Sequence, residues 1–126
     1  MNIKQEEIIE HYKNPNNFYK LDNYTHTYKA VNYSCGDEIE VFLIVKNKKI
    51  VKISFIGSGC SISIATASIL SDYLVNKYVH NVLLLNVEDV VSLLGIDITV
   101  SRRKCAYLPL FAIQQALKKK SGVNIT

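Results

Sequence analysis

Two neighbouring segments in the first half of the chain alternate between apolar and polar positions. Residues 38–46 and 50–56 both repeat with a period of two, which is the period of a β-strand. The turn at Asn47 returns the chain between them, so the pattern predicts an antiparallel hairpin. Strand-forming residues at 27–33 predict a third strand beside it. The pattern places Ile39, Val41, Leu43 and Val45 on one face of the strand at 38–46, and Glu38, Glu40, Phe42 and Ile44 on the other.

Helical spacing of apolar residues dominates the remaining chain. It predicts helices at 3–13, 60–78 and 105–120. Asn86 as an N-cap and Gly95 as a terminator predict one more helix between them. The order of elements predicts an α+β fold, in which helices pack on one face of a three-stranded antiparallel sheet.

Pro109 lies within the last predicted helix. Because a proline costs little in a first helical turn, a helix that begins near Cys105 accommodates it better than one that begins at Ser101. We therefore expect Cys105 at a helix N-terminus.

Length and composition are those of an ordinary globular protein. The 126 residues suit a single domain over 1–126, and 48% hydrophobic against 21% charged residues disfavours disorder. Residues 1–10 lack the apolar run of a secretory signal, and 81–95 is too polar to span a membrane. We expect a cytoplasmic protein with no membrane partner.

The formal charge of +4 comes from Lys and Arg residues that are spread along the chain in short clusters. Nucleic-acid binding usually shows a denser basic stripe, so we expect no nucleic-acid partner. Mild positive charge equally suits an acidic protein surface.

The three cysteines all fall at the ends of predicted elements. Cys35 separates two strands, whereas Cys60 and Cys105 begin helices, where free N–H groups and the helix dipole lower a thiol pKa. Asp37 follows Cys35 by two positions, and three thiolates with one carboxylate would complete a tetrahedral site for zinc or a small iron-sulfur cluster. Buried cysteines also pack as small apolar groups, and no Cys-x-x-Cys pair is present, so spacing alone leaves both readings open.

The residues around the cysteines are more specific than their spacing. They read Cys35-Gly36-Asp37, then Gly57-Ser58-Gly59-Cys60-Ser61-Ile62-Ser63, then Arg103-Lys104-Cys105-Ala106-Tyr107-Leu108, after an opening His11-Tyr12-Lys13-Asn14-Pro15-Asn16-Asn17. In this order they resemble the iron-sulfur cluster assembly scaffolds of the IscU, SufU and NifU N-terminal domain type, over nearly the whole chain.

This resemblance implies a single SufE/NifU-like α+β domain, in which helices pack on a three-stranded antiparallel sheet. It implies that Cys35, Cys60 and Cys105 bind a zinc ion or, transiently, a 2Fe-2S cluster. It implies that Asp37 is the fourth metal ligand or tunes the release of the cluster. It further implies that Cys105 accepts persulfide sulfur. The implied partners are a cysteine desulfurase and recipient apo iron-sulfur proteins, and a homo-oligomer is left open.

The segment before Cys105 departs from the IscU branch. Thr99-Val100-Ser101-Arg102-Arg103-Lys104 lacks both the histidine and the Leu-Pro-Pro-Val-Lys chaperone motif of that branch. A basic residue before the third cysteine resembles the SufU branch, yet the insertion usual there is missing, since Cys60 and Cys105 are 45 positions apart. We expect Lys104 to favour the thiolate of Cys105, and the basic run to steer an acidic surface of the desulfurase.

Three functional hypotheses follow. The first is an assembly scaffold that is not an enzyme, the second a zinc-dependent sulfurtransferase, and the third a zinc-stabilised interaction domain. The histidines His11, His26 and His80 are left out of the site, as a surface helix residue and two loop residues. The small residues of the helix after Cys60 are expected only to permit close packing, and they are Ser61, Ser63, Ala65, Ala67 and Ser68.

Overall fold

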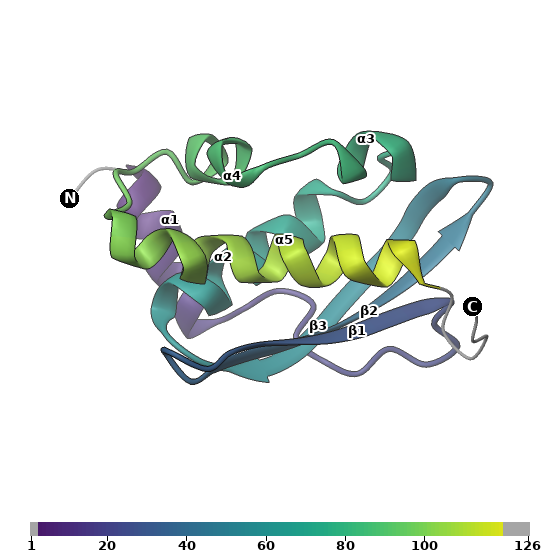
Figure 1. The fold of residues 1–126 in the computed structure, drawn as a ribbon, viewed down its shortest axis with the longest axis horizontal. Helices are drawn as coiled ribbons and strands as arrows, with labels where there is room; N and C mark the ends of the chain where they lie inside the picture. Colours follow the sequence, from purple (N-terminus) through teal and green to yellow (C-terminus); the bar gives the residue numbers. More distant parts are fainter. Residues whose placement is uncertain (1–2, 120–126) are drawn as a thin grey trace.

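The computed structural model describes residues 3–119, which form a three-stranded sheet and five α-helices. The strands are β1 (His26–Asn32), β2 (Asp37–Lys46) and β3 (Lys49–Ser58). The helices are α1 (Ile3–Lys13), α2 (Ser61–Tyr73), α3 (Val79–Leu83), α4 (Val87–Leu94) and α5 (Arg103–Lys118), with a short 3₁₀ helix η1 (Val100–Arg102) before α5. The predicted α+β class is confirmed (Figure 1).

The sheet is antiparallel throughout, in the order β1-β2-β3. The predicted hairpin is confirmed, and Asn47 and Lys48 at its turn both have positive φ, of 53° and 64°. A turn with two such residues matches the right-handed twist of paired strands. The register shifts between Ile44 and Val45, which leaves Val51 partly exposed beside the turn.

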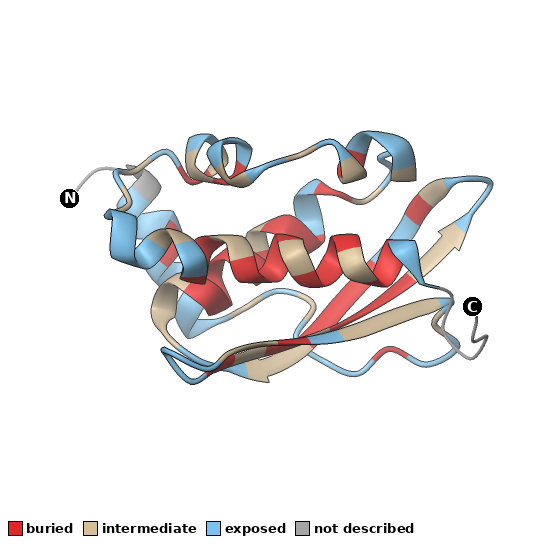
Figure 2. Ribbon diagram, viewed as in Figure 1, coloured by how far each residue is buried: buried red, intermediate tan, exposed pale blue. Residues whose placement is uncertain are grey.

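Helices cover one face of the sheet, as predicted. Figure 1 shows α5 lying across the sheet, where it packs against β1 and β2, while α2 packs against β3. Figure 2 shows that buried residues line α5 along this contact. Ile39, Val41 and Leu43 belong to this core, and Val45 packs at its margin. Burial of these side chains is the main source of stability for the arrangement.

The opposite face of the sheet is partly covered by the segment between α1 and β1. Phe42 is buried there, and the Tyr24 ring packs against it with centroids 5.3 Å apart. Leu21 is buried in the same connecting segment between α1 and β1. The sequence pattern could not reveal this cover, because the segment has no regular period.

The helix predicted at 60–78 is wrong after Tyr73. Helix α2 ends at Tyr73, and Asn76 has a positive φ of 73°. The backbone N–H of Asn76 donates to the carbonyl of Ile50, and the N–H of Ile50 donates to the carbonyl of Lys77. Pairing with the start of β3 therefore replaces the last helical turns, and the short helix α3 follows without having been predicted.

The ends of the last two helices test the predictions from caps and proline. Asn86 forms a capping box with Asp89, and Gly95 closes α4 with φ of 71°, as predicted. Helix α5, in contrast, begins two residues before Cys105, so Pro109 lies beyond its first turn. The predicted end at Lys120 lies outside the described residues.

Among residues 3–119, no helix is both long and apolar enough to cross a membrane.

Candidate metal centre

Four ends of secondary structure bring the predicted ligands to one place. Cys35 lies in the turn between β1 and β2, and Asp37 is the first residue of β2. Cys60 is the N-cap of α2, and Cys105 lies in the first turn of α5. Gly36 has φ of +74°, a conformation that suits glycine in this tight turn.

Three of the predicted ligands form a group that could hold a metal ion. The Sγ atoms of Cys35 and Cys105 and a carboxylate oxygen of Asp37 all lie within 4.8 Å of one another. Cys60 adjoins this group through Asp37, because its Sγ lies 3.7 Å from Oδ2. Cys35 is exposed and Cys60 is half-buried, whereas Cys105 has only 1% of its surface exposed.

The separations suit a tetrahedral ion. With Zn–S distances of about 2.3 Å and Zn–O distances of about 2.1 Å, two sulfur ligands lie about 3.8 Å apart and a sulfur and an oxygen about 3.6 Å apart. The Sγ atoms of Cys35 and Cys105 are 3.8 Å apart, and Cys60 Sγ and Asp37 Oδ2 are 3.7 Å apart. Both pairs therefore match edges of such a tetrahedron.

Hydrogen bonds hold the Asp37 carboxylate in place. The backbone N–H of Cys60 donates to Oδ1 at 2.9 Å, and the Ser63 hydroxyl donates to Oδ2 at 2.7 Å. A Cβ on Gly59 would lie 2.6 Å from Oδ1, so only glycine permits this approach. The carboxylate has 1% of its surface exposed and is fixed before any ligand binds.

Ser63 also reaches the helix that carries the third cysteine. Pro109 has no N–H to donate to the carbonyl of Cys105, four residues earlier. The Ser63 Oγ lies 3.2 Å from that carbonyl oxygen and 3.6 Å from the Sγ of Cys60. Its one hydroxyl hydrogen is thus placed between Asp37 and Cys105, and the prediction that Ser63 serves only for packing is wrong.

The pKa values of Asp37 and Cys60 both lie below their ordinary values. Burial raises the pKa of Asp37, but hydrogen bonds from the Ser63 hydroxyl and the Cys60 backbone outweigh it. Burial likewise raises the pKa of Cys60, and the backbone N–H and hydroxyl of Ser63 lower it further than burial raises it. The lowered thiol pKa expected at a helix N-terminus is therefore found at Cys60.

Cys105 behaves in the opposite way. Burial first, and then hydrogen bonds with Asp37, Cys60 and Cys35, raise its pKa to about 12. The prediction that Lys104 favours a thiolate at Cys105 is wrong, because Lys104 is exposed and lines a groove with Leu85 and Tyr107. Without a metal, Cys105 therefore keeps its proton.

The basic run before Cys105 divides into separate roles. Arg102 faces the thiols, and hydrogen bonding and charge attraction to Cys60 raise its pKa. Arg103 instead forms a bidentate ion pair with Glu88 of α4, in which the two guanidinium nitrogens lie 2.6 and 3.3 Å from the two carboxylate oxygens. A run of three basic residues could not reveal which one faces the thiols, since that depends on the start of α5.

No histidine among the described residues belongs to the ligand group. His11 is half-buried rather than free on the surface, and its Nδ1 lies 2.7 Å from the Ser68 hydroxyl. The expected loop positions of the other two are wrong, because His26 begins β1 and His80 lies in α3.

Comparisons with known proteins agree with this geometry. The family described as NifU-like N terminal domain matches residues 3–125. The zinc-dependent sulfurtransferase SufU of Bacillus subtilis is 28% identical, over 93% of this chain and 90% of the relative. The iron-sulfur cluster assembly scaffold protein IscU of Thermotoga maritima is 30% identical, over 91% of this chain and 93% of the relative.

Solved structures show the same fold. The crystal structure of FiSufU from Fervidobacterium islandicum has a TM-score of 0.78 and 24% identity, and covers 89% of this chain and 94% of its own. The N-terminal part of a NifU-like protein from Brucella abortus has a TM-score of 0.75 at 12% identity, over 90% of each chain.

Proposed function

This chain belongs to the NifU-like N-terminal domain family, and we propose that it is an iron-sulfur cluster assembly protein. In this proposal Cys35, Asp37, Cys60 and Cys105 hold a zinc ion or a nascent cluster. Cys105 accepts persulfide sulfur from a cysteine desulfurase, and recipient apo-proteins take the assembled cluster.

The observation that carries the proposal is that thiol sulfurs and a carboxylate oxygen lie close enough together to bind one metal ion. Two thiol sulfurs and a fixed carboxylate oxygen lie within 4.8 Å of one another, and a third thiol adjoins them. A bound zinc ion would supply charge that stabilises thiolates, and the residues present fit it in donor type and separation. A purely apolar packing role for these cysteines does not explain a fixed carboxylate among them.

Sulfur transfer requires a thiolate at Cys105 and access to it. The thiolate attacks the outer sulfur of the desulfurase persulfide, a new S–S bond forms, and the desulfurase cysteine leaves as a thiolate. Cys105 is buried beneath the turn that carries Cys35. We therefore expect residues 33–36 to move when the desulfurase docks.

The zinc-dependent sulfurtransferase is the second candidate. The lowered pKa of Asp37 favours it, because a carboxylate that stays ionised is a permanent hard ligand beside the thiols. In that case the metal is structural, and sulfur passes through the protein without cluster assembly. The third candidate, a zinc-stabilised interaction domain, needs the same ligands but no reactive thiol.

One experiment separates these functions. Protein purified without air is analysed for zinc, iron and acid-labile sulfide, and desulfurase turnover is measured with wild type and Cys105→Ser. We expect iron with sulfide after loading, and loss of stimulation in the variant. Ser92→Ala, an exposed change on α4, is the control for handling and stability.

Each outcome selects a function. Zinc without cluster formation, but with stimulation that Cys105→Ser abolishes, would replace the scaffold by sulfur transfer. Stimulation that survives in Cys105→Ser, together with a lowered melting temperature, would leave only the interaction domain. Absence of bound metal in protein that retains all four ligands would contradict every version.

A further inference from the structure

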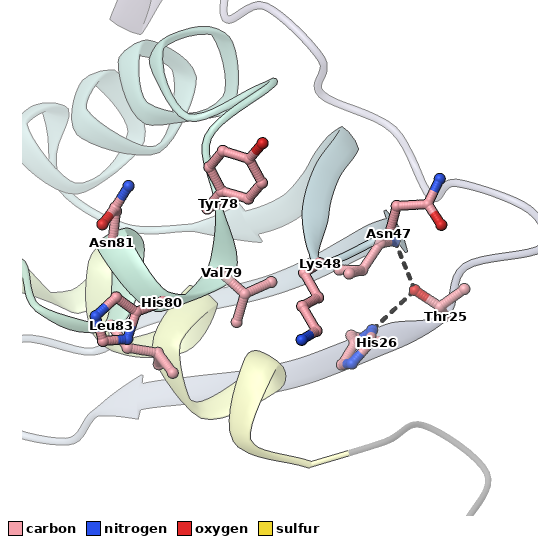
Figure 3. A pocket seen from close by; sticks show the side chains of 10 residues that line it. Thr25, His26, Asn47, Lys48, Tyr78, Val79, His80, Asn81 and Leu83 are labelled. Atoms are coloured by element: carbon pink, nitrogen blue, oxygen red, sulfur yellow. Dashed lines mark hydrogen bonds between the residues drawn. The ribbon is translucent and has the colours of Figure 1, made fainter.

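A groove lies at the end of the sheet that is farther from the cysteines. It has a volume of about 1220 Å³ and is formed by the β2–β3 turn, the start of β1 and helix α3. Val45, Val79 and Leu83 supply apolar surface, and Lys48 reaches in between His26 and Val79 (Figure 3). None of the described residues that line this groove is acidic.

Hydrogen bonds of the backbone N–H groups hold the groove walls together. The N–H of Val79 donates to the carbonyl of Lys48 at 2.8 Å, which ties α3 to the hairpin turn. On the other side, the N–H of Val45 donates to the Thr25 hydroxyl at 2.8 Å. The turn is therefore held on both sides, and a ligand would meet a preformed surface.

The charge around the groove has one sign. Lys46, Lys48 and Lys49 lie at the turn, and Lys77 lies just before α3. Within the described part of the chain, none of these four ammonium groups forms an ion pair with a carboxylate. Lys49 and Lys77 instead lie over the rings of Tyr78 and Tyr73, each 5.0 Å from the centroid.

The groove has an apolar floor and a basic rim. It is therefore complementary to a ligand that has one apolar face and acidic groups along the edges of that face. The volume exceeds the roughly 300–1,000 Å³ usual for small-molecule pockets. We propose that this groove docks an acidic, amphipathic peptide segment of a partner protein.

The groove and the candidate metal centre lie at opposite ends of β2. Asp37 begins this ten-residue strand, and Lys46 ends it. At about 3.3 Å per residue the two sites are about 30 Å apart. A partner held at the groove would leave the thiols open to a second protein, so this docking does not depend on the proposed sulfur chemistry.

The test uses a defined probe, a fluorescein-labelled peptide of about 14 residues with Leu at helical spacing and Glu between. Binding to the full chain is measured by fluorescence anisotropy, and the site by NMR shifts of backbone amides. We expect saturable binding, with shifts concentrated at Thr25, Lys48, Val79 and Leu83. Lys48→Glu should weaken binding at least about tenfold, since it opposes like charges.

Two comparisons isolate the groove from general charge attraction. Lys52→Glu makes the same charge change on the opposite face of the hairpin. Lys52 is exposed and pairs with Ile44, whose side chain lies on the other face of β2 from the groove residue Val45. It should leave binding within about twofold of wild type. Val45→Thr keeps the side-chain volume while replacing a methyl group by a hydroxyl, and it should weaken binding about threefold or more.

Several results would overturn the proposal. They are absence of saturable binding, equal loss in Lys48→Glu and Lys52→Glu, or shifts that map elsewhere. Equal binding of a peptide with Lys in place of Glu would exclude an acidic partner. The same amide shifts on concentrating the protein alone would assign the groove to a second copy, and tighter binding of a single-stranded oligonucleotide would assign it to nucleic acid.

Discussion

Ser63 is the residue whose replacement tests the site most directly. It has no exposed surface, and its hydroxyl donates to Asp37 at 2.7 Å. Ser63→Ala removes a hydrogen bond to a buried carboxylate, which typically costs about 1.5–3 kcal/mol. We expect a free energy of unfolding lower by about that amount in chemical denaturation, and weaker zinc retention against a chelator.

A matched serine gives the control for that change. Ser92 is exposed on α4, and Ser92→Ala should alter neither the free energy of unfolding nor zinc retention beyond about 0.5 kcal/mol. If Ser63→Ala retains zinc as wild type does and unfolds at the same denaturant concentration, Ser63 does not position Asp37.

The thiols should differ in reactivity once metal is removed. Cys60 is half-buried with a lowered pKa, whereas Cys105 is buried with a pKa raised to about 12. Because the thiolate is the reactive form, iodoacetamide at pH 8 should modify Cys60 well before Cys105. Mass spectrometry of digested protein at successive times measures both rates. Equal rates in folded protein would contradict the burial and the raised pKa of Cys105.

At this scale the sequence predicted candidate ligands, but not the contacts that hold them in place. Cys35, Asp37, Cys60 and Cys105 carry recognisable flanking residues, so their candidacy could be read from the chain. The role of Ser63 depends on a carboxylate 26 positions earlier in the sequence and on a carbonyl left free by Pro109. No local pattern records a contact of that kind.

At the scale of elements, Asn86 provides a clean test of a prediction made from sequence. Its side chain accepts from the Asp89 backbone at 3.1 Å, and the Asp89 carboxylate accepts from the Asn86 backbone at 2.8 Å. Asn86→Ala removes the cap and should cost about 1 kcal/mol. Asn86→Ser keeps a capping oxygen and should recover most of the loss. Thermal or chemical unfolding measures both, and equal losses would mean that the cap does not stabilise α4.

Elements with strong local signals were predicted and those defined by distant pairing were not. The strands follow from alternation, and α4 from Asn86 and Gly95. The end of α2 depends on hydrogen bonds between Asn76 and Ile50, which no helical pattern contains. Helix α5 begins at Arg103, two residues earlier than predicted, and this first residue pairs with Glu88 of a different helix. Tertiary partners set these boundaries where intrinsic propensity is weak.

At the scale of the whole molecule, the two ends of the sheet divide its surface. Thiols and Arg102 lie at one end, and the basic groove around Lys48 lies at the other. The core between them, built from β2, β3 and α5, fixes their separation. Binding at one end can therefore proceed while the other is occupied, unless the core itself changes.

The pH dependence of global stability follows from Cys105. Its pKa rises from 9.0 to about 12 on folding, so the folded state holds this proton more tightly than the unfolded state. That contribution to stability is fully present below about pH 9 and is lost as pH rises towards 12. Linkage sets the steepest loss at about 1.4 kcal/mol per pH unit.

Replacing the thiol should remove this loss. Metal-free wild type and Cys105→Ala are unfolded in denaturant at several values between pH 8 and about 10.5, a range that spans the ordinary thiol pKa. Other alkaline groups, such as Tyr and Lys side chains, titrate in both proteins and cancel in the difference. We expect the wild-type advantage over Cys105→Ala to shrink as pH rises. An advantage that stays constant or grows would mean that Cys105 is ionised in the folded, metal-free protein, and that the charges around it favour the thiolate after all.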